Sequence, residues 1–117
     1  MADALGGVLS DTEPFRYWAF ISYSHRDQRW AAWLIRRLEA YRLPRDLVGR
    51  EGRDGPLPSR LFPIFRDRDE LSSSPELGGE IQRALRTSRY LVVICSPDSA
   101  RSRWVDEEIR YFKSLGR

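Results

Sequence analysis

Residues 90–95 read Tyr-Leu-Val-Val-Ile-Cys, and this short run decides the fold class of the chain. Its residues are apolar in succession and do not alternate with polar ones. Such a run is typical of a strand that is covered on both faces, as in a parallel sheet between layers of helices. The sequence Ser-Pro-Asp-Ser at 96–99 then breaks the pattern, so the strand is predicted to end there.

Two earlier segments also have the composition of strands. Residues 17–24, Tyr-Trp-Ala-Phe-Ile-Ser-Tyr-Ser, are largely aromatic or β-branched and predict a buried strand. Residues 61–65, Leu-Phe-Pro-Ile-Phe, predict another. Because proline has no N–H to donate, Pro63 indicates an edge or the start of a strand. The single cysteine, Cys95, lies in the last predicted strand, where we expect it to be a small core residue.

Helical patterns follow each predicted strand. Asp27 is a suitable N-cap for a helix that ends before Pro44. Ser74-Pro75-Glu76 predicts the start of a second helix, and the segment after Ser102 has the period of a third. The apolar positions are Trp30, Trp33, Leu34, Leu38 and Tyr41 in the first helix, and Leu77, Ile81, Ala84 and Leu85 in the second.

The order β-α-β-α-β-α predicts an α/β fold, a flavodoxin-like parallel sheet with helices on both faces. We expect residues 1–15 to be a flexible lead-in and the single domain to begin at residue 16. Residues 42–60 have no apolar period, so this long connection is either functional or loose. Ligands of such sheets bind beyond the carboxyl ends of the strands, here in loops 22–27, 66–74 and 96–103.

Composition excludes several classes of function. With 41% hydrophobic and 32% charged residues, the 117-residue chain is globular. Its +3 net charge is scattered among acids, without the basic stripe of a nucleic-acid binder. One histidine and one cysteine offer no metal-ligand spacing. No run is long enough to span a membrane, and the first residues lack a secretory signal, so we expect a cytoplasmic protein.

One carboxylate falls on the wrong side of the third helix. At 100° per residue from Trp104, Glu108 lies at roughly 40°, inside an apolar arc from roughly 340° to 140°. A carboxylate that faces a core must be paired, protonated or used, because burial of a bare charge is costly. Glu107 lies outside the arc, where we expect surface ion pairs with Arg103 and Arg110. The arc consists of Tyr111, Trp104, Leu115, Phe112, Val105 and Ile109.

Each candidate site residue has two interpretations at this point. Glu108 is either a structural ion-pair partner of an arginine or a carboxylate that stabilises an oxocarbenium-like transition state. His25 is a solvated loop residue or a ligand contact. The run Arg66–Glu70 is a solvated turn or a binding loop, and Ser72–Ser74 form a helix cap or hold a phosphate.

Four segments resemble the boxes of the TIR (Toll/interleukin-1 receptor) domain family. Phe20-Ile21-Ser22-Tyr23-Ser24 resembles its first box, and residues 65–71, Phe-Arg-Asp-Arg-Asp-Glu-Leu, resemble the second, which enters the BB loop. Residues 91–99 resemble the third strand and its serine-proline turn. The pattern Ser102-x-Trp104-x-x-x-Glu108 is similar to the family's Ser-x-Trp-Cys-x-x-Glu helix, with Val105 in place of cysteine. Residues 16–117 thus resemble a TIR domain of bacterial type.

The resemblance also has implications for function. Many bacterial and plant members cleave the nicotinamide–ribose bond of NAD+, in signalling or defence, with NAD+ as substrate and no cofactor. The family's catalytic glutamate, four residues after the helix tryptophan, corresponds to Glu108, and Trp104 shapes the pocket. Ser24, His25 and Arg26 correspond to the loop that contacts the nucleotide. The loop that gates the pocket and meets a neighbouring TIR domain corresponds to Arg66, Asp67, Arg68, Asp69, Glu70 and Leu71.

Two alternatives remain open from the sequence. Animal receptor and adaptor members are mainly assembly modules, so the chain is alternatively a non-enzymatic interaction module. Another α/β N-glycosidase that acts on nucleosides is a further interpretation. The family continues through further strand–helix units after the third helix, and we therefore expect this C-terminally incomplete domain to be part of a longer protein.

Overall fold

The computed structural model describes residues 14–53, 55–66 and 78–116, and these contain a parallel three-stranded sheet. Strand β1 (Tyr17–Ser22) lies between β4 (Ile64–Arg66) and β5 (Ser88–Val93). Both neighbours run parallel to β1, and Ala19 faces Ile64 on one side and Tyr90 on the other. The carboxyl ends of the three strands therefore meet at one edge, as the parallel prediction requires.

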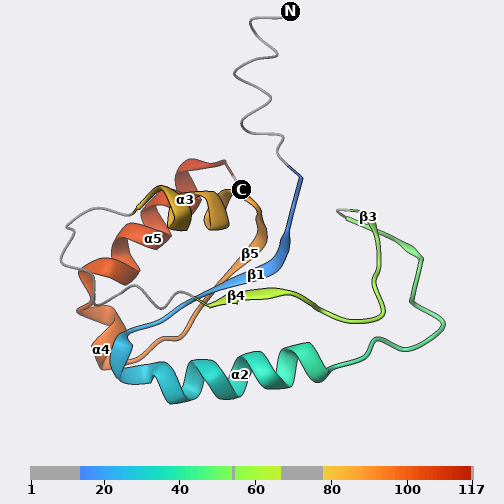
Figure 1. Cartoon of the computed structure of the whole chain (residues 1–117), viewed down its shortest axis with the longest axis horizontal. Helices are drawn as coiled ribbons and strands as arrows, with labels where there is room; N and C mark the ends of the chain where they lie inside the picture. Colours follow the sequence, from blue (N-terminus) through green and yellow to red (C-terminus); the bar gives the residue numbers. More distant parts are fainter. Residues whose placement is uncertain (1–13, 54, 67–77, 117) are drawn as a thin grey trace, which may run out of the picture.

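Helices cover both faces of this sheet (Figure 1). Helix α2 (Gln28–Ala40) lies on one face, and α3 (Gly79–Arg86) and α5 (Arg103–Ser114) lie together on the other. A 3-10 turn, η1 (His25–Asp27), leads into α2, and the short α4 (Pro97–Ala100) follows β5. The predicted α/β class with two helical layers is confirmed.

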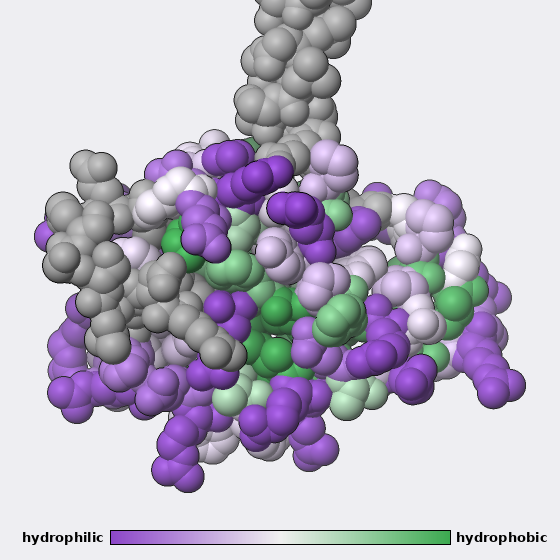
Figure 2. Space-filling model, in the orientation of Figure 1, coloured by the Kyte–Doolittle hydropathy of each residue, from purple (hydrophilic) through white to green (hydrophobic). Residues whose placement is uncertain are grey.

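Two clusters of buried side chains fill the spaces between the layers. Phe20 and Ile21 are adjacent in β1 and fully buried, and successive strand residues point to opposite faces. Phe20 packs with Leu85 of α3 and Phe112 of α5, whereas Ile21 packs with Ala31 of α2. Figure 2 shows apolar surface in the middle of one face of the molecule, ringed by hydrophilic side chains.

The strand boundaries differ from the predicted ones. Strand β1 ends at Ser22 because the chain then turns into η1, and β4 begins only after Pro63. The carbonyl of Pro63 still accepts a hydrogen bond from the N–H of Trp18. Strand β5 starts two residues earlier than expected and ends at Val93. Cys95 consequently lies past the strand and is exposed, so its predicted place in the core is wrong.

Helix α2 packs on the sheet through a row of aliphatic residues, and not through the predicted row that includes Trp30 and Trp33. The contacts use Ala31, Leu34, Ile35 and Leu38, at i, i+3, i+4 and i+7. Trp30 and Trp33 lie beside this stripe and remain 64% and 45% exposed. Tyr41, at 54%, is exposed as well.

The connection between α2 and β4 contains structure that the sequence did not predict. Strands β2 (Glu51–Gly52) and β3 (Gly55–Pro56) form a small antiparallel ladder. Glu39 ties the end of the connection to α2, because its carboxylate accepts from the N–H of Ile64 and its carbonyl accepts from the guanidinium of Arg60.

Two predicted features lie wholly or mostly outside the described residues. These are the flexible lead-in and the helix start at Ser74-Pro75-Glu76. Within the described part, α3 has Gly78 as its N-cap, and its predicted residues Ile81, Ala84 and Leu85 are buried. None of the described helices is long and apolar enough to cross a membrane.

Leu85 provides a test of the core. The substitution Leu85→Ala should lower the free energy of unfolding by about 2–5 kcal/mol, because it leaves a cavity beside Phe20. Val48, which is 40% exposed, is the control, and Val48→Ala should change that free energy by less than about 0.5 kcal/mol. Urea denaturation followed by circular dichroism measures both. Equal small changes would contradict this assignment of the core.

Candidate functional site

Glu108 lies inside the protein, at the place that the helical phase predicts. Its side chain is fully buried, and Oε1 accepts a hydrogen bond of 2.7 Å from Oγ of Ser22. Ser22 is the last residue of β1 and is fully buried as well. A serine of the central strand thus donates a hydrogen bond to the buried carboxylate.

Local interactions fix the helix that carries Glu108. Ser102 caps α5, because its Oγ accepts from the N–H of Val105 at 3.1 Å. Val105 is buried, and Phe112 packs against Phe20 of the sheet and Leu85 of α3. Trp104 is half-buried beside the same cluster, one turn before Glu108 and on the same side of the helix. The helix therefore presents Trp104 and Glu108 together.

The ion pair of Arg110 differs from the one expected with Glu107, the neighbour of Glu108. Arg110 does not pair with Glu107 but binds Asp106 one turn earlier, with its Nε donating to Oδ2 at 2.8 Å. This hydrogen bond and the charge of Asp106 raise the pKa of Arg110 above its ordinary value. The i, i+4 spacing of Asp106 and Arg110 favours this pairing.

The turn after β1 carries the other three predicted ligand residues. Ser24 is buried and caps η1, because its Oγ accepts from the N–H of Arg26 at 3.4 Å. His25 and Arg26 are exposed, as expected of a solvated loop. Asp27 is the N-cap residue of α2, as predicted, but its side chain makes no capping hydrogen bond.

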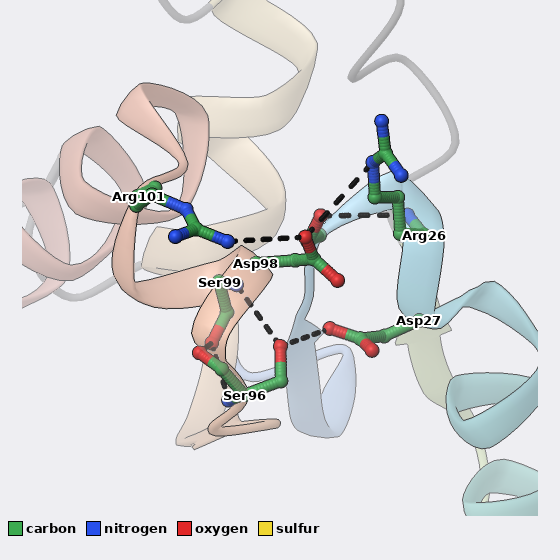
Figure 3. Close-up of polar contacts among 7 residues, drawn as sticks. Arg26, Asp27, Ser96, Asp98, Ser99 and Arg101 are labelled. Carbon is green, nitrogen blue, oxygen red and sulfur yellow. Dashed lines mark hydrogen bonds and ion pairs between the residues drawn. The ribbon is translucent and has the colours of Figure 1, made fainter.

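The carboxylate of Asp27 instead binds the loop that follows β5 (Figure 3). Its Oδ2 accepts a hydrogen bond of 2.5 Å from Oγ of Ser96. Ser96 and Ser99 form a capping box that starts α4, each side chain accepting from the backbone N–H of the other. These bonds hold the loops after β1 and β5 against each other at the carboxyl edge of the sheet.

A polar cavity of about 450 Å³ lies between these two loops. Asp98 forms an ion pair with an arginine of each loop. Its Oδ1 lies 3.9 Å from Nε of Arg26, after β1, and 3.8 Å from Nη2 of Arg101, after β5. Figure 3 shows the two arginines approaching Asp98 from opposite sides. The cavity is lined by Ser24, Arg26, Asp98, Arg101 and Ser102.

The structure brings only some of the predicted residues together. Ser24 and Arg26 line the polar cavity, whereas Glu108 is buried on Ser22 at the end of β1 and Trp104 packs against the core cluster of Phe20. Arg66 ends the neighbouring strand β4 at the same carboxyl edge, opposite Ile21, and its Nε donates to the hydroxyl of Tyr23 at 3.1 Å. The rest of the predicted interaction loop, Asp67 to Leu71, lies outside the described residues. The described residues contain no group of His, Cys, Asp and Glu that could hold a metal.

Three side chains of this region, Ser22, Asp98 and Arg101, were not predicted from the sequence to take part in a site. Ser22 ends an otherwise apolar run, and a serine in that position is a usable signal for a polar partner in the core. Asp98 and Arg101 lie in the predicted loop 96–103 but were not singled out. Their ion pairs depend on the turn after β1, so spacing along the chain does not reveal them.

This arrangement supports a definite kind of chemistry. A buried carboxylate that accepts a hydrogen bond from Ser22 lies one helical turn after an aromatic side chain, and Ser24, two residues after Ser22, lines a cavity with two guanidinium groups. Fixed negative charge in a water-poor site stabilises positive charge that develops on a bound sugar. Guanidinium groups bind phosphate oxygens. A sugar phosphate ester therefore suits the site.

Comparisons with known proteins agree with the geometry. The family model described as Thoeris protein ThsB, TIR-like domain, matches residues 20–117. The chain is 37% identical over 100 residues to the protein named NAD(+) hydrolase ApTIR from Actinoplanes sp. (strain ATCC 31044 / CBS 674.73 / SE50/110). That alignment covers 85% of the chain but only 12% of ApTIR, and no solved structure matches. Since the family match covers most of its length, the chain belongs to the family of TIR-like domains.

Proposed function

We propose that this TIR-like domain cleaves the nicotinamide–ribose bond of NAD+, with Glu108 as the catalytic carboxylate. The observation that carries the proposal is the burial of Glu108 at the end of β1, on the hydroxyl of Ser22. A carboxylate that served only solubility would lie on the exposed side of α5. The name of ApTIR, an NAD(+) hydrolase, supports the choice of substrate.

The proposed reaction needs little from the protein except electrostatics and position. The bond between C1′ of the ribose and the nicotinamide nitrogen breaks, and its electron pair leaves with nicotinamide as a neutral molecule. The ribose becomes an oxocarbenium-like cation, which the carboxylate of Glu108 stabilises. Water then adds at C1′ and releases one proton, so that ADP-ribose and nicotinamide are the products. Internal attack by the adenine base in place of water would give a cyclic product.

Access to the carboxylate is a condition of this proposal. Glu108 has no exposed surface in the structure, so the ribose reaches it only when neighbouring side chains move. Homotypic assembly with other TIR domains is the step that we propose provides this movement. The site then switches from a closed to an open state when copies of the domain meet.

The alternative function is a non-enzymatic interaction module for signal transduction. It is favoured by the exposed Trp30 and Trp33 on α2, since aromatic residues dominate the binding energy of protein interfaces. In this alternative Glu108 and Ser22 only join α5 to the sheet. The two functions differ in what a change at Glu108 does to turnover.

The substitution Glu108→Gln separates them. It keeps the shape and an oxygen that can accept from Ser22, but it removes the negative charge. We expect nicotinamide release from NAD+, measured by chromatography at high protein concentration, to fall at least about 100-fold. Glu107→Gln, on the neighbouring partly exposed residue, is the matched control and should retain turnover. Unchanged turnover in Glu108→Gln, or no release from the assembled parent chain, would favour the interaction module.

The hydrogen bond from Ser22 should orient the carboxylate of Glu108 for catalysis, so loss of this bond should slow turnover. We expect Ser22→Ala to lower kcat about 10- to 100-fold and to change KM much less, because a misplaced carboxylate loses transition-state stabilisation. Ser88→Ala is the control, since Ser88 is equally buried and its Oγ donates to the carbonyl of Ala84, away from Glu108. A loss of kcat of the same size in both variants would show a general packing effect.

A further inference from the structure

Among the described residues, those that line the polar cavity between the loops after β1 and β5 include two arginines but one acid. Arg26 and Arg101 share the carboxylate of Asp98, which is the one acid that the described residues contribute to the lining. The two pairs, at 3.9 and 3.8 Å, are longer than hydrogen bonds. A guanidinium has five N–H donors, so these contacts leave donors for a ligand. The cavity is therefore built for an anion with several oxygens.

Other groups of the cavity also favour an anion. The side chains of Arg26 and Arg101 are 80% and 76% exposed, so a ligand reaches them directly. The hydroxyls of Ser24 and Ser102 line the same space. Ser102 caps the twelve-residue helix α5, so the positive end of that helix dipole points toward the cavity. These contributions all act in the same direction.

The cavity lies at a suitable separation from Glu108. Ser24, which lines the cavity, is only two residues past Ser22, whose hydroxyl binds Glu108. Ser102 is six residues before Glu108, about 9 Å along the axis of α5. In a dinucleotide such as NAD+, the ring of one ribose and one methylene group separate C1′ from the diphosphate. One bound dinucleotide can therefore reach both places.

We propose that Arg101 and Arg26, held on either side of Asp98, form the site for the diphosphate of a dinucleotide whose ribose lies at Glu108. This inference rests on the proposed function for the identity of the dinucleotide. It assigns a ligand-binding role to Arg101, which lies on the loop after β5. Asp98 keeps the two guanidinium groups apart and facing the cavity before the ligand arrives.

The first test measures binding without turnover. ADP-ribose and inorganic pyrophosphate are titrated by calorimetry into the parent chain, Arg101→Gln and the control Arg103→Gln. Arg103 is an exposed arginine nearby that does not line the cavity. We expect Arg101→Gln to weaken binding of both probes about 10-fold and Arg103→Gln to leave it unchanged. Equal effects of the two variants, or no binding to the parent chain, would overturn the proposal.

The second test uses substrates with and without the diphosphate. In Arg101→Gln, kcat/KM for NAD+ should fall about 10-fold through KM, while kcat/KM for nicotinamide riboside, which has no phosphate, should stay the same. An equal loss for both substrates would mean that Arg101 supports the site only structurally. A chain that binds ADP-ribose through Arg101 but releases no nicotinamide would contradict the proposed function and leave this inference intact.

Discussion

The hydrogen bond between Ser22 and Glu108 is the constraint on which the arrangement of this domain depends. It joins the end of the central strand to the last described helix, across 86 positions of the chain. Both side chains are fully buried, so the carboxylate would be costly to keep in the core without this donor. The bond fixes α5 along the sheet, and with it Trp104 and the cap at Ser102. The core and the candidate site therefore share one polar contact.

The same edge of the sheet collects the remaining polar contacts. Parallel strands bring the loops after β1 and β5 side by side, and Asp27 with Ser96 then binds one loop to the other. The pairs of Asp98 with Arg26 and Arg101 lie next to this bond (Figure 3). The polar cavity and the carboxylate of Glu108 differ in their exposure to solvent. The cavity has exposed charged side chains, whereas the carboxylate of Glu108 is fully buried.

Much of this could be predicted from the sequence because two periodicities are strong. The continuous run at 90–95 indicated a covered parallel sheet, and the helical phase of Glu108 located its carboxylate in the core. The sequence indicates less where a distant partner decides the outcome. Asp27 binds Ser96 and not its own helix, and Trp30 stays exposed because Ala31 and its stripe fit the sheet better. The helix propensity of a residue depends on its sequence neighbours, so it predicts neither the bond from Asp27 to a distant loop nor the face of α2 that packs on the sheet.

The order of the strands has a consequence for how the domain is made. The central strand β1 comes first in the chain, but both of its neighbours, β4 and β5, are synthesised after it. Phe20 and Ile21 therefore emerge from the ribosome without the side chains that later bury them. Contacts between distant segments are slow to form and expose apolar strands to aggregation meanwhile. A nascent chain of this domain should depend on chaperones until α5 closes over Ser22.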